Sequence, residues 1–127
     1  MRQSFGVLFA ALAGTVIGGG VVHNLHAQAK PPAYYITEVD VHDAKAFAPY
    51  GAGVQATLDP FGGRFIIRGG MVTTISGDPP KGRVAVIAFD SAEKAQAWFD
   101  SPLYQTIKPI RLKNATSRAF IVEGVAK

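Results

Sequence analysis

The sequence contains no cysteine, and beyond residue 29 its only histidine is His42. Without cysteine the chain can form neither disulfides nor thiolate metal ligands, and it has no thiol nucleophile. A zinc site needs three or four nitrogen, sulfur or carboxylate ligands, so we expect no metal. His42 adjoins Asp43 between a strand pattern and a helix pattern, where local capping fits better than a Ser-His-Asp relay. We also expect no cofactor.

Clusters of one charge sign are missing as well. The chain has 13 Lys and Arg against 9 Asp and Glu, and the basic residues are scattered rather than grouped. This distribution lacks the basic patch typical of nucleic-acid binding, so we expect no nucleic-acid partner. The pairs Gly62-Gly63 and Gly69-Gly70 lack the Lys-Ser/Thr of a phosphate-binding loop, and we interpret them as turns and a bulge.

The first 29 residues differ from the rest of the chain. A positive start is followed by an uncharged segment over residues 5–22, FGVLFAALAGTVIGGGVV, and then by Ala27-Gln28-Ala29. This pattern predicts a signal peptide cleaved after Ala29, which would place residues 30–127 in the periplasm or outside the cell. The alternative is a membrane anchor, because 18 uncharged residues are just long enough to span a bilayer. In that case residues 5–22 hold the domain in the inner membrane, and an uncleaved leader is its sole membrane contact.

Residues 30–127 have the length of one domain, with alternating strand and helix patterns. Asp43 is a plausible N-cap for the first helix, Asp90 or Ser91 for the second, and Ser101-Pro102 restarts the helix, which Pro109 must bend or shorten. The order β-α-β-β-α-β is that of a ferredoxin-like α+β fold with an antiparallel four-stranded sheet. The expected elements are strands at 34–41, 64–68, 83–89 and 119–122, a short continuation or bulged ribbon at 71–75, a loop at 76–82, and helices from 43 to 58 and from 91 onward.

Two of the expected strands are apolar on both faces. In Arg83–Phe89, RVAVIAF, and in Ala119–Val122, AFIV, both residue parities are hydrophobic. The helices can cover one face of the sheet, and an exposed second face normally alternates with polar residues. We therefore expect a homodimer that buries the second face, with a monomer carrying an apolar patch as the alternative.

Several short motifs resemble one family. They are Phe61-Gly62-Gly63-Arg64-Phe65, Arg68-Gly69-Gly70, Phe89-Asp90-Ser91, Ser101-Pro102-Leu103-Tyr104 and Val122-Glu123-Gly124. In this order, from about Tyr34 to Gly124, they resemble the family called domain of unknown function 1330. The resemblance implies a dimeric α+β barrel, in which two ferredoxin-like sheets close against each other. It implies no activity.

Charged residues inside the strands suggest a site. Glu38 shares the parity of apolar residues in its strand, and so do Arg68 and Glu123 in theirs. If these parities face one side, the charges must pair or bind a ligand, because buried charge is costly. One hypothesis is a small-molecule cavity in which Arg68 holds an anionic group and Glu38 or Glu123 is a catalytic acid or base. Residues from the helices, Tyr50, Tyr104 and Arg111, would line its rim. The other is a structural Arg–Glu network that fixes strand register and dimer geometry.

Two functions follow from this pattern. The first is an exported homodimeric module that binds a small organic molecule or is purely structural, without turnover. The second is a cofactor-independent oxygenase or isomerase acting on a small aromatic or lactone-like compound, which rests on analogy of fold. An enclosed pocket containing a Glu or Tyr of perturbed pKa would favour the enzyme. A cavity filled by the protein's own side chains would favour the module.

Overall fold

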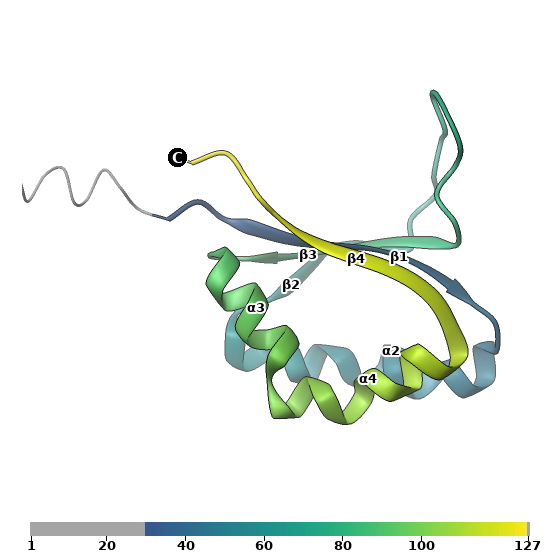
Figure 1. Ribbon diagram of the computed structural model, residues 1–127, viewed down its shortest axis with the longest axis horizontal. Helices are drawn as coiled ribbons and strands as arrows, with labels where there is room; N and C mark the ends of the chain where they lie inside the picture. Colours follow the sequence, from purple (N-terminus) through teal and green to yellow (C-terminus); the bar gives the residue numbers. More distant parts are fainter. Residues whose placement is uncertain (1–29, 127) are drawn as a thin grey trace, which may run out of the picture. The chain divides into compact units, whose positions relative to one another are not determined.

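The computed structural model describes residues 30–126 (Figure 1). The expected signal peptide or anchor lies outside this range. The elements are β1 (Ala33–Val41), α2 (Ala44–Leu58), a short 3-10 helix η1 (Asp59–Phe61), β2 (Arg64–Arg68), β3 (Arg83–Phe89), α3 (Ala92–Asp100), α4 (Pro102–Asn114) and β4 (Ala115–Glu123). Among the described residues, no helix is long and apolar enough to cross a membrane.

The four strands form one antiparallel sheet in the order β2-β3-β1-β4. This is the predicted ferredoxin-like α+β arrangement, which the structure confirms. Helices α2, α3 and α4 all lie on the same side of the sheet (Figure 1). Alternate residues of β1 are buried beneath them, beginning with Ala33 and Tyr35. The sheet therefore has a helix-side face and an open face.

Short polar side chains begin each helix. Asp43 accepts a hydrogen bond from the Ala46 amide at 3.1 Å, and Ser101 accepts one from Tyr104 at 3.1 Å. Of the two caps predicted for α3, Ser91 is the one used, and it accepts from the Lys94 amide at 3.2 Å. Helix α4 continues through Pro109 to Asn114 and is not shortened there.

One predicted strand boundary and one predicted ribbon are wrong. Strand β4 begins at Ala115 instead of Ala119, because the polar residues before Ala119 pair with the far end of β1. Pairing with a neighbouring strand outweighs their weak strand propensity. Residues 71–75 form no strand. They belong to the long β2–β3 loop, which rises from the sheet on the side away from the helices (Figure 1).

The core lies between the helices and the sheet. Its largest fully buried side chains are Trp98, Tyr104, Phe89 and Leu58. Gly63 allows β2 to pass close to this core, since a Cβ there would lie 2.7 Å from the Phe89 ring. Tyr35 meets Trp98 edge-on, with ring centroids 5.0 Å apart. The core is therefore largely aromatic, and three tyrosine side chains approach one another within it.

Candidate functional site

A bulge in β2 places its two arginines on opposite faces. The register shifts between Phe65 and Ile67, so Arg64 pairs with Ala88 while Arg68 pairs with Ala85. Ala88 and Ala85 differ in parity, and directly paired residues share a face. Arg64 is therefore on the open face and Arg68 on the helix side. Arg64 and Arg68 are both even-numbered, and an uninterrupted strand would place them on one face, but the bulge inserts one extra residue between them.

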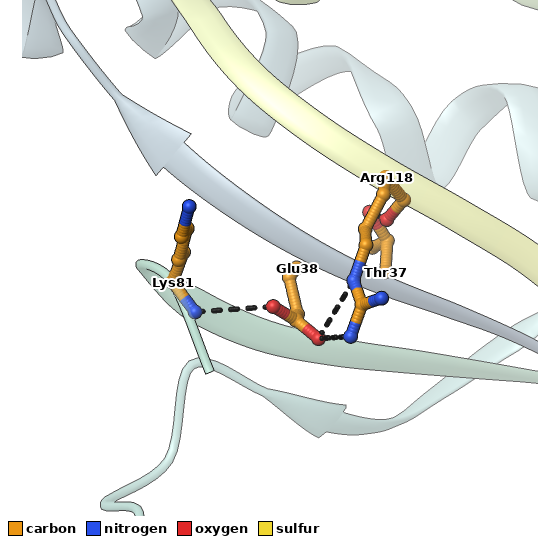
Figure 2. Close-up of polar contacts among 4 residues, drawn as sticks. All are labelled: Thr37, Glu38, Lys81 and Arg118. Atoms are coloured by element: carbon orange, nitrogen blue, oxygen red, sulfur yellow. Dashed lines mark hydrogen bonds and ion pairs between the residues drawn. The ribbon is translucent and has the colours of Figure 1, made fainter. Parts of the chain in front are cut away.

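Glu38 lies on the open face, in an ion pair with Arg118. The Arg118 Nη2 and Nε atoms lie 2.6 and 3.1 Å from Oε2 of Glu38 (Figure 2). The Lys81 amide donates to Oε1 at 3.0 Å, which ties the end of the β2–β3 loop to the sheet. These hydrogen bonds, that from Arg118 first, lower the pKa of Glu38. Glu38 is therefore a paired carboxylate, remote from the helix-side residues.

Glu123 is separate from both Glu38 and Arg68. Glu123 belongs to β4 and pairs with Ala33 of β1, which gives it the parity of the helix-side face, but it is exposed. Arg68 is in β2, at the opposite edge of the sheet. The structure therefore does not bring the two candidate carboxylates together with Arg68 on one face. The catalytic roles suggested for Glu38 and Glu123 would need a site that this arrangement does not form.

Helices α2 and α4 bring three of the predicted residues into one hydrogen-bonded cluster. The hydroxyls of Tyr50 and Tyr104 are 2.8 Å apart, and Nε of Arg111 donates to the Tyr104 hydroxyl at 3.2 Å. The guanidinium also donates to the Ser117 hydroxyl. Arg111 is only 5% exposed and has no carboxylate partner among residues 30–126. Tyr104 and Arg111 lie in the interior, around a buried positive charge, and Tyr50 connects them to the cavity described below.

The electrostatics of this cluster follow from burial. Burial, reinforced by Tyr104, raises the pKa of Tyr50 well above its ordinary value, and the same causes raise that of Tyr35. Burial opposes the charged form of Arg111, but the neighbouring phenols Tyr104 and Tyr35 outweigh it and raise the pKa of Arg111. At neutral pH the cluster therefore contains one cation and protonated Tyr35 and Tyr50.

The Tyr35 hydroxyl is unsatisfied. It is buried close to the side chains of Tyr104 and Thr37, but it makes no hydrogen bond of normal geometry within the described part of the chain. Tyr35 as a whole is 3% exposed. Such a buried donor costs about 1–3 kcal/mol when it has no partner. The sequence analysis missed Tyr35, although its parity in β1, opposite to that of Glu38, was a signal that it faces the core.

A cavity of about 100 Å³ lies between α2 and the sheet. Tyr35 and Tyr50 line it together with two arginines, Arg68 and Arg83, and the rings of Phe47 and Phe65. Nη2 of Arg68 donates to the Gly51 carbonyl at 2.7 Å, and its guanidinium lies 4.3 Å from the centre of the Phe65 ring. The lining contains no Asp, Glu, His or Lys. Arg68 therefore lies where a helix-side ligand would meet it, and Arg83 is a second arginine that sequence reasoning missed.

A larger, open hollow of about 510 Å³ lies at the other face. Glu38, Asp40, Arg118 and residues 78–81 of the β2–β3 loop border it. Its acidic and basic groups include the ion pair of Figure 2. Within residues 30–126, no three His, Asp or Glu side chains are grouped in a way that could hold a metal ion. The two hollows thus differ in kind: one is a small cationic and aromatic cavity, the other a broad surface whose carboxylates and cations adjoin.

Several solved structures share this fold. A protein of unknown function from Rhodopseudomonas palustris aligns with a TM-score of 0.62 and 18% identity, covering 84% of this chain and 92% of that one. SnoaB, a cofactor-independent oxygenase from Streptomyces nogalater, aligns with a TM-score of 0.57 and 12% identity, covering 76% and 96%. A dimeric protein of unknown function and ferredoxin-like fold from Bacteroides fragilis gives 0.52 and 8%, covering 73% and 96%. At these identities the likeness shows the fold alone.

The sequence comparisons give a family. Curated proteins show no significant match to this chain. The profile described as Domain of unknown function (DUF1330) matches residues 32–125, nearly all of the described range and all four strands. The family resemblance carried by the glycine, arginine and tyrosine motifs is therefore confirmed, and the chain belongs to the DUF1330 family.

Proposed function

We propose that this protein is an exported homodimer that binds a small organic molecule in the cavity between α2 and the sheet. The observation that carries the proposal is Tyr35: its side chain lines the cavity, and its hydroxyl is buried without a hydrogen-bond partner of normal geometry among the described residues. Nearly all buried polar groups in native proteins are hydrogen-bonded, so an exception needs an explanation. A ligand with an acceptor atom would satisfy this hydroxyl.

The cluster behind the cavity supports the same reading. Arg111 keeps a buried charge without a carboxylate, although replacing such a group by an apolar one often stabilises a fold. Tyr50 belongs both to the cavity wall and to the hydrogen-bonded cluster that contains Arg111. The charge is thus linked to the cavity through two hydroxyls. A purely structural core would have no use for an arrangement that lowers its stability.

The open face supports the homodimer. Phe120 and Ile67 lie there 47% and 46% exposed, beside the half-buried Ile36 and Val84. Burying one large apolar side chain contributes roughly 1.5–3 kcal/mol. Four such residues from each of two copies offset an association cost of about 4–15 kcal/mol. The structural neighbour from Bacteroides fragilis is described as dimeric with this fold. A second copy is therefore the partner we propose for this face.

Export rests on the sequence of the leader. Residues 5–22 carry no charge, and Ala27-Gln28-Ala29 supplies the small residues that a signal peptidase reads. We propose cleavage after Ala29 and a periplasmic or secreted domain. Anchoring in the inner membrane by residues 5–22 is the alternative outcome of the experiment below.

A cofactor-independent oxygenase or isomerase is the second candidate. The feature that favours it is the hydrogen-bonded chain from Tyr50 to Tyr104 and Arg111, in which the permanently charged guanidinium stabilises negative charge that develops at the cavity wall. SnoaB, which has this fold, is a cofactor-independent oxygenase. Turnover of the bound compound would distinguish an enzyme from a binding module.

Native mass spectrometry of the full-length chain, expressed in a bacterium that exports it, tests the proposal. We expect a subunit that begins at Lys30, a dimer, and additional mass from a bound compound. Tyr35→Phe should lose the compound yet unfold at the same or a higher urea concentration, because the deleted hydroxyl has no partner to lose.

Tyr34→Phe is the matched control, because Tyr34 is the neighbouring tyrosine but faces the open side of the sheet. It should leave the bound compound in place. If Tyr35→Phe retains the compound and destabilises the subunit, the hydroxyl is structural and the proposed binding site is wrong.

A further inference from the structure

The cavity between α2 and the sheet has an unbalanced charge. Arg68 and Arg83 both line it, and neither has a carboxylate within 4.0 Å among residues 30–126. The cavity's other ionisable groups are Tyr35 and Tyr50, whose pKa values burial raises, so they stay protonated at neutral pH. Both arginines are exposed, so water screens part of their mutual repulsion, and an anion between or beside them would remove the rest.

Strand pairing explains why the two arginines converge. Arg68 pairs with Ala85, and Arg83 shares the parity of Ala85 on the same strand, so both belong to the helix-side face. The Gly69 backbone lies beside the Arg83 side chain: an ideal Cβ atom built on Gly69 would lie 3.8 Å from Cδ of Arg83. The bulge at Ile66 is what turns Arg68 toward this face.

Aromatic rings support both guanidinium groups. Arg68 lies over Phe65 at 4.3 Å, and Arg83 lies 5.7 Å from the centre of the Phe47 ring. Stacking restricts a guanidinium group without occupying its N–H donors, and Arg68 gives one bond to Gly51 out of the five that an arginine offers. The two arginines are thus held in place with donors still available. Carboxylates match this planar fork of donors in two parallel hydrogen bonds.

We infer that the ligand is a small carboxylic acid with an apolar body, its carboxylate held by Arg68 and Arg83 and its body lying between Phe47 and Phe65. The inference rests on the proposed binding function and names the class of ligand. The cavity of about 100 Å³ is somewhat smaller than the roughly 150 Å³ that accommodates benzene in an engineered protein core. The body of the acid is therefore about one small ring or a short branched chain. The carboxylate completes the site by accepting hydrogen bonds from the two arginines.

Calorimetric titration of the purified, exported protein with matched acids and amides tests this inference. The probes are benzoate against benzamide, and isobutyrate against isobutyramide. We expect each acid to bind at least about tenfold more tightly than its amide, the equivalent of about 1.4 kcal/mol. Arg68→Gln and Arg83→Gln should each weaken the binding of the acid by about tenfold or more and leave that of the amide unchanged.

Arg64→Gln is the matched control, because Arg64 lies on the same strand as Arg68 but on the open face. It should bind the acids as the unmodified protein does. Arg68→Lys keeps the charge but not the fork, so it should recover a part of the affinity. Circular dichroism of each variant separates lost binding from lost folding.

Three results overturn the inference. The first is equal binding of acids and amides, and the second is an Arg64→Gln variant that binds the acid as weakly as Arg68→Gln does. The third is competition by inorganic phosphate as strong as that by benzoate, which would show that the apolar body is not recognised. Failure to bind any acid, together with a neutral compound that co-purifies and is lost in Tyr35→Phe, overturns the ligand class and preserves the cavity. If no acid binds and Tyr35→Phe has no effect on any bound compound, the proposed binding function is overturned as well.

Discussion

The two faces of this sheet are both apolar, yet they treat their charged residues differently. On the open face, Glu38 and Arg118 form an ion pair, and the Lys81 amide donates a hydrogen bond to the same carboxylate. On the helix side, Arg68, Arg83 and Arg111 have no carboxylate partner among the described residues. Their neighbours there are tyrosine hydroxyls and aromatic rings. One face balances its charges internally, and the other keeps an excess of positive charge.

This difference separates the two hypotheses that the sequence left open. A register-fixing Arg–Glu network describes the open face. There Glu38 and Arg118 are already paired, so a second subunit can cover them without burying an unpaired charge. A ligand site describes the helix side, where Arg68 and Arg83, both without a carboxylate partner among the described residues, line one cavity together with Tyr35. Residues that lower the stability of a fold are commonly retained for function. The helix side is therefore where we place the chemistry, and the open face is where we place the assembly.

The largest effect should come from a charge placed on the open face. Phe120→Asp introduces a carboxylate where a side chain is 47% exposed in the single subunit. In the proposed dimer the substitution occurs twice, and each copy loses roughly 1.5–3 kcal/mol of apolar burial. The dimer dissociation constant should therefore rise by about a hundredfold or more. Sedimentation velocity over a range of concentrations measures it.

Leu112→Asp is the control for this prediction. Leu112 is 59% exposed, but it belongs to α4 and lies away from the open face. It should sediment as the unmodified protein does. If the unmodified protein is a single subunit at high concentration, or if both substitutions act alike, the assignment of assembly to the open face is wrong.

The sequence predicted the fold well because strand and helix patterns reflect local burial. The order of strand and helix patterns, with the continuous apolarity of residues 83–89 and 119–122, was enough to predict the sheet and an apolar second face. The sequence also grouped Tyr50, Tyr104 and Arg111 as site residues, and the structure joins them directly. The sequence placed all three on the helical segments, but it could not show that the charge of Arg111 is buried.

What the sequence could not predict depends on register. Parity fixes a face only while every strand pairs without interruption, and the bulge at Ile66 reverses it for Arg68. The partner of Glu38 was missed because Arg118 belongs to a stretch of β4 whose polar residues gave no strand signal. Tyr35 and Arg83 were missed because their importance comes from a cavity and from absent partners, which no local pattern encodes.

An intermediate effect should appear at alkaline pH, and it belongs to the helix side. Burial, first of all, raises the pKa of Tyr50 and of Tyr35, so folding favours their neutral forms. Their contribution to stability is intact below the ordinary tyrosine value of about 10 and is lost as the pH rises above it. Each group should lower the free energy of unfolding by about 1.4 kcal/mol per pH unit in that range. Urea unfolding between about pH 8 and pH 11 measures this slope.

Tyr50→Phe should reduce the alkaline slope. It removes one of the two titrating groups, although it also costs about 1 kcal/mol at neutral pH through the hydrogen bond to Tyr104. Tyr34→Phe, on the open face, should change neither quantity. Equal alkaline slopes for Tyr50→Phe and the unmodified protein would contradict the prediction that ionisation of the helix-side cluster controls stability there.

The smallest effect should appear at acid pH, and it belongs to the open face. Hydrogen bonds from Arg118 and the Lys81 amide lower the pKa of Glu38. The stability that this carboxylate contributes is therefore present above the ordinary glutamate value of about 4.3 and is lost as the pH falls below it. In the single subunit the pair is accessible to water and screened, so its contribution there is small. In the dimer both copies of the pair would be shielded, so the dimer dissociation constant should rise a few-fold when the pH is lowered.

Glu38→Gln tests this prediction. It should form a weaker dimer at neutral pH and lose most of the acid dependence, whereas Glu123→Gln, at the exposed edge of the other face, should keep that dependence. Sedimentation of the three proteins at neutral and acid pH decides whether the ion pair belongs to the interface, because an acid dependence that survives in Glu38→Gln must arise elsewhere.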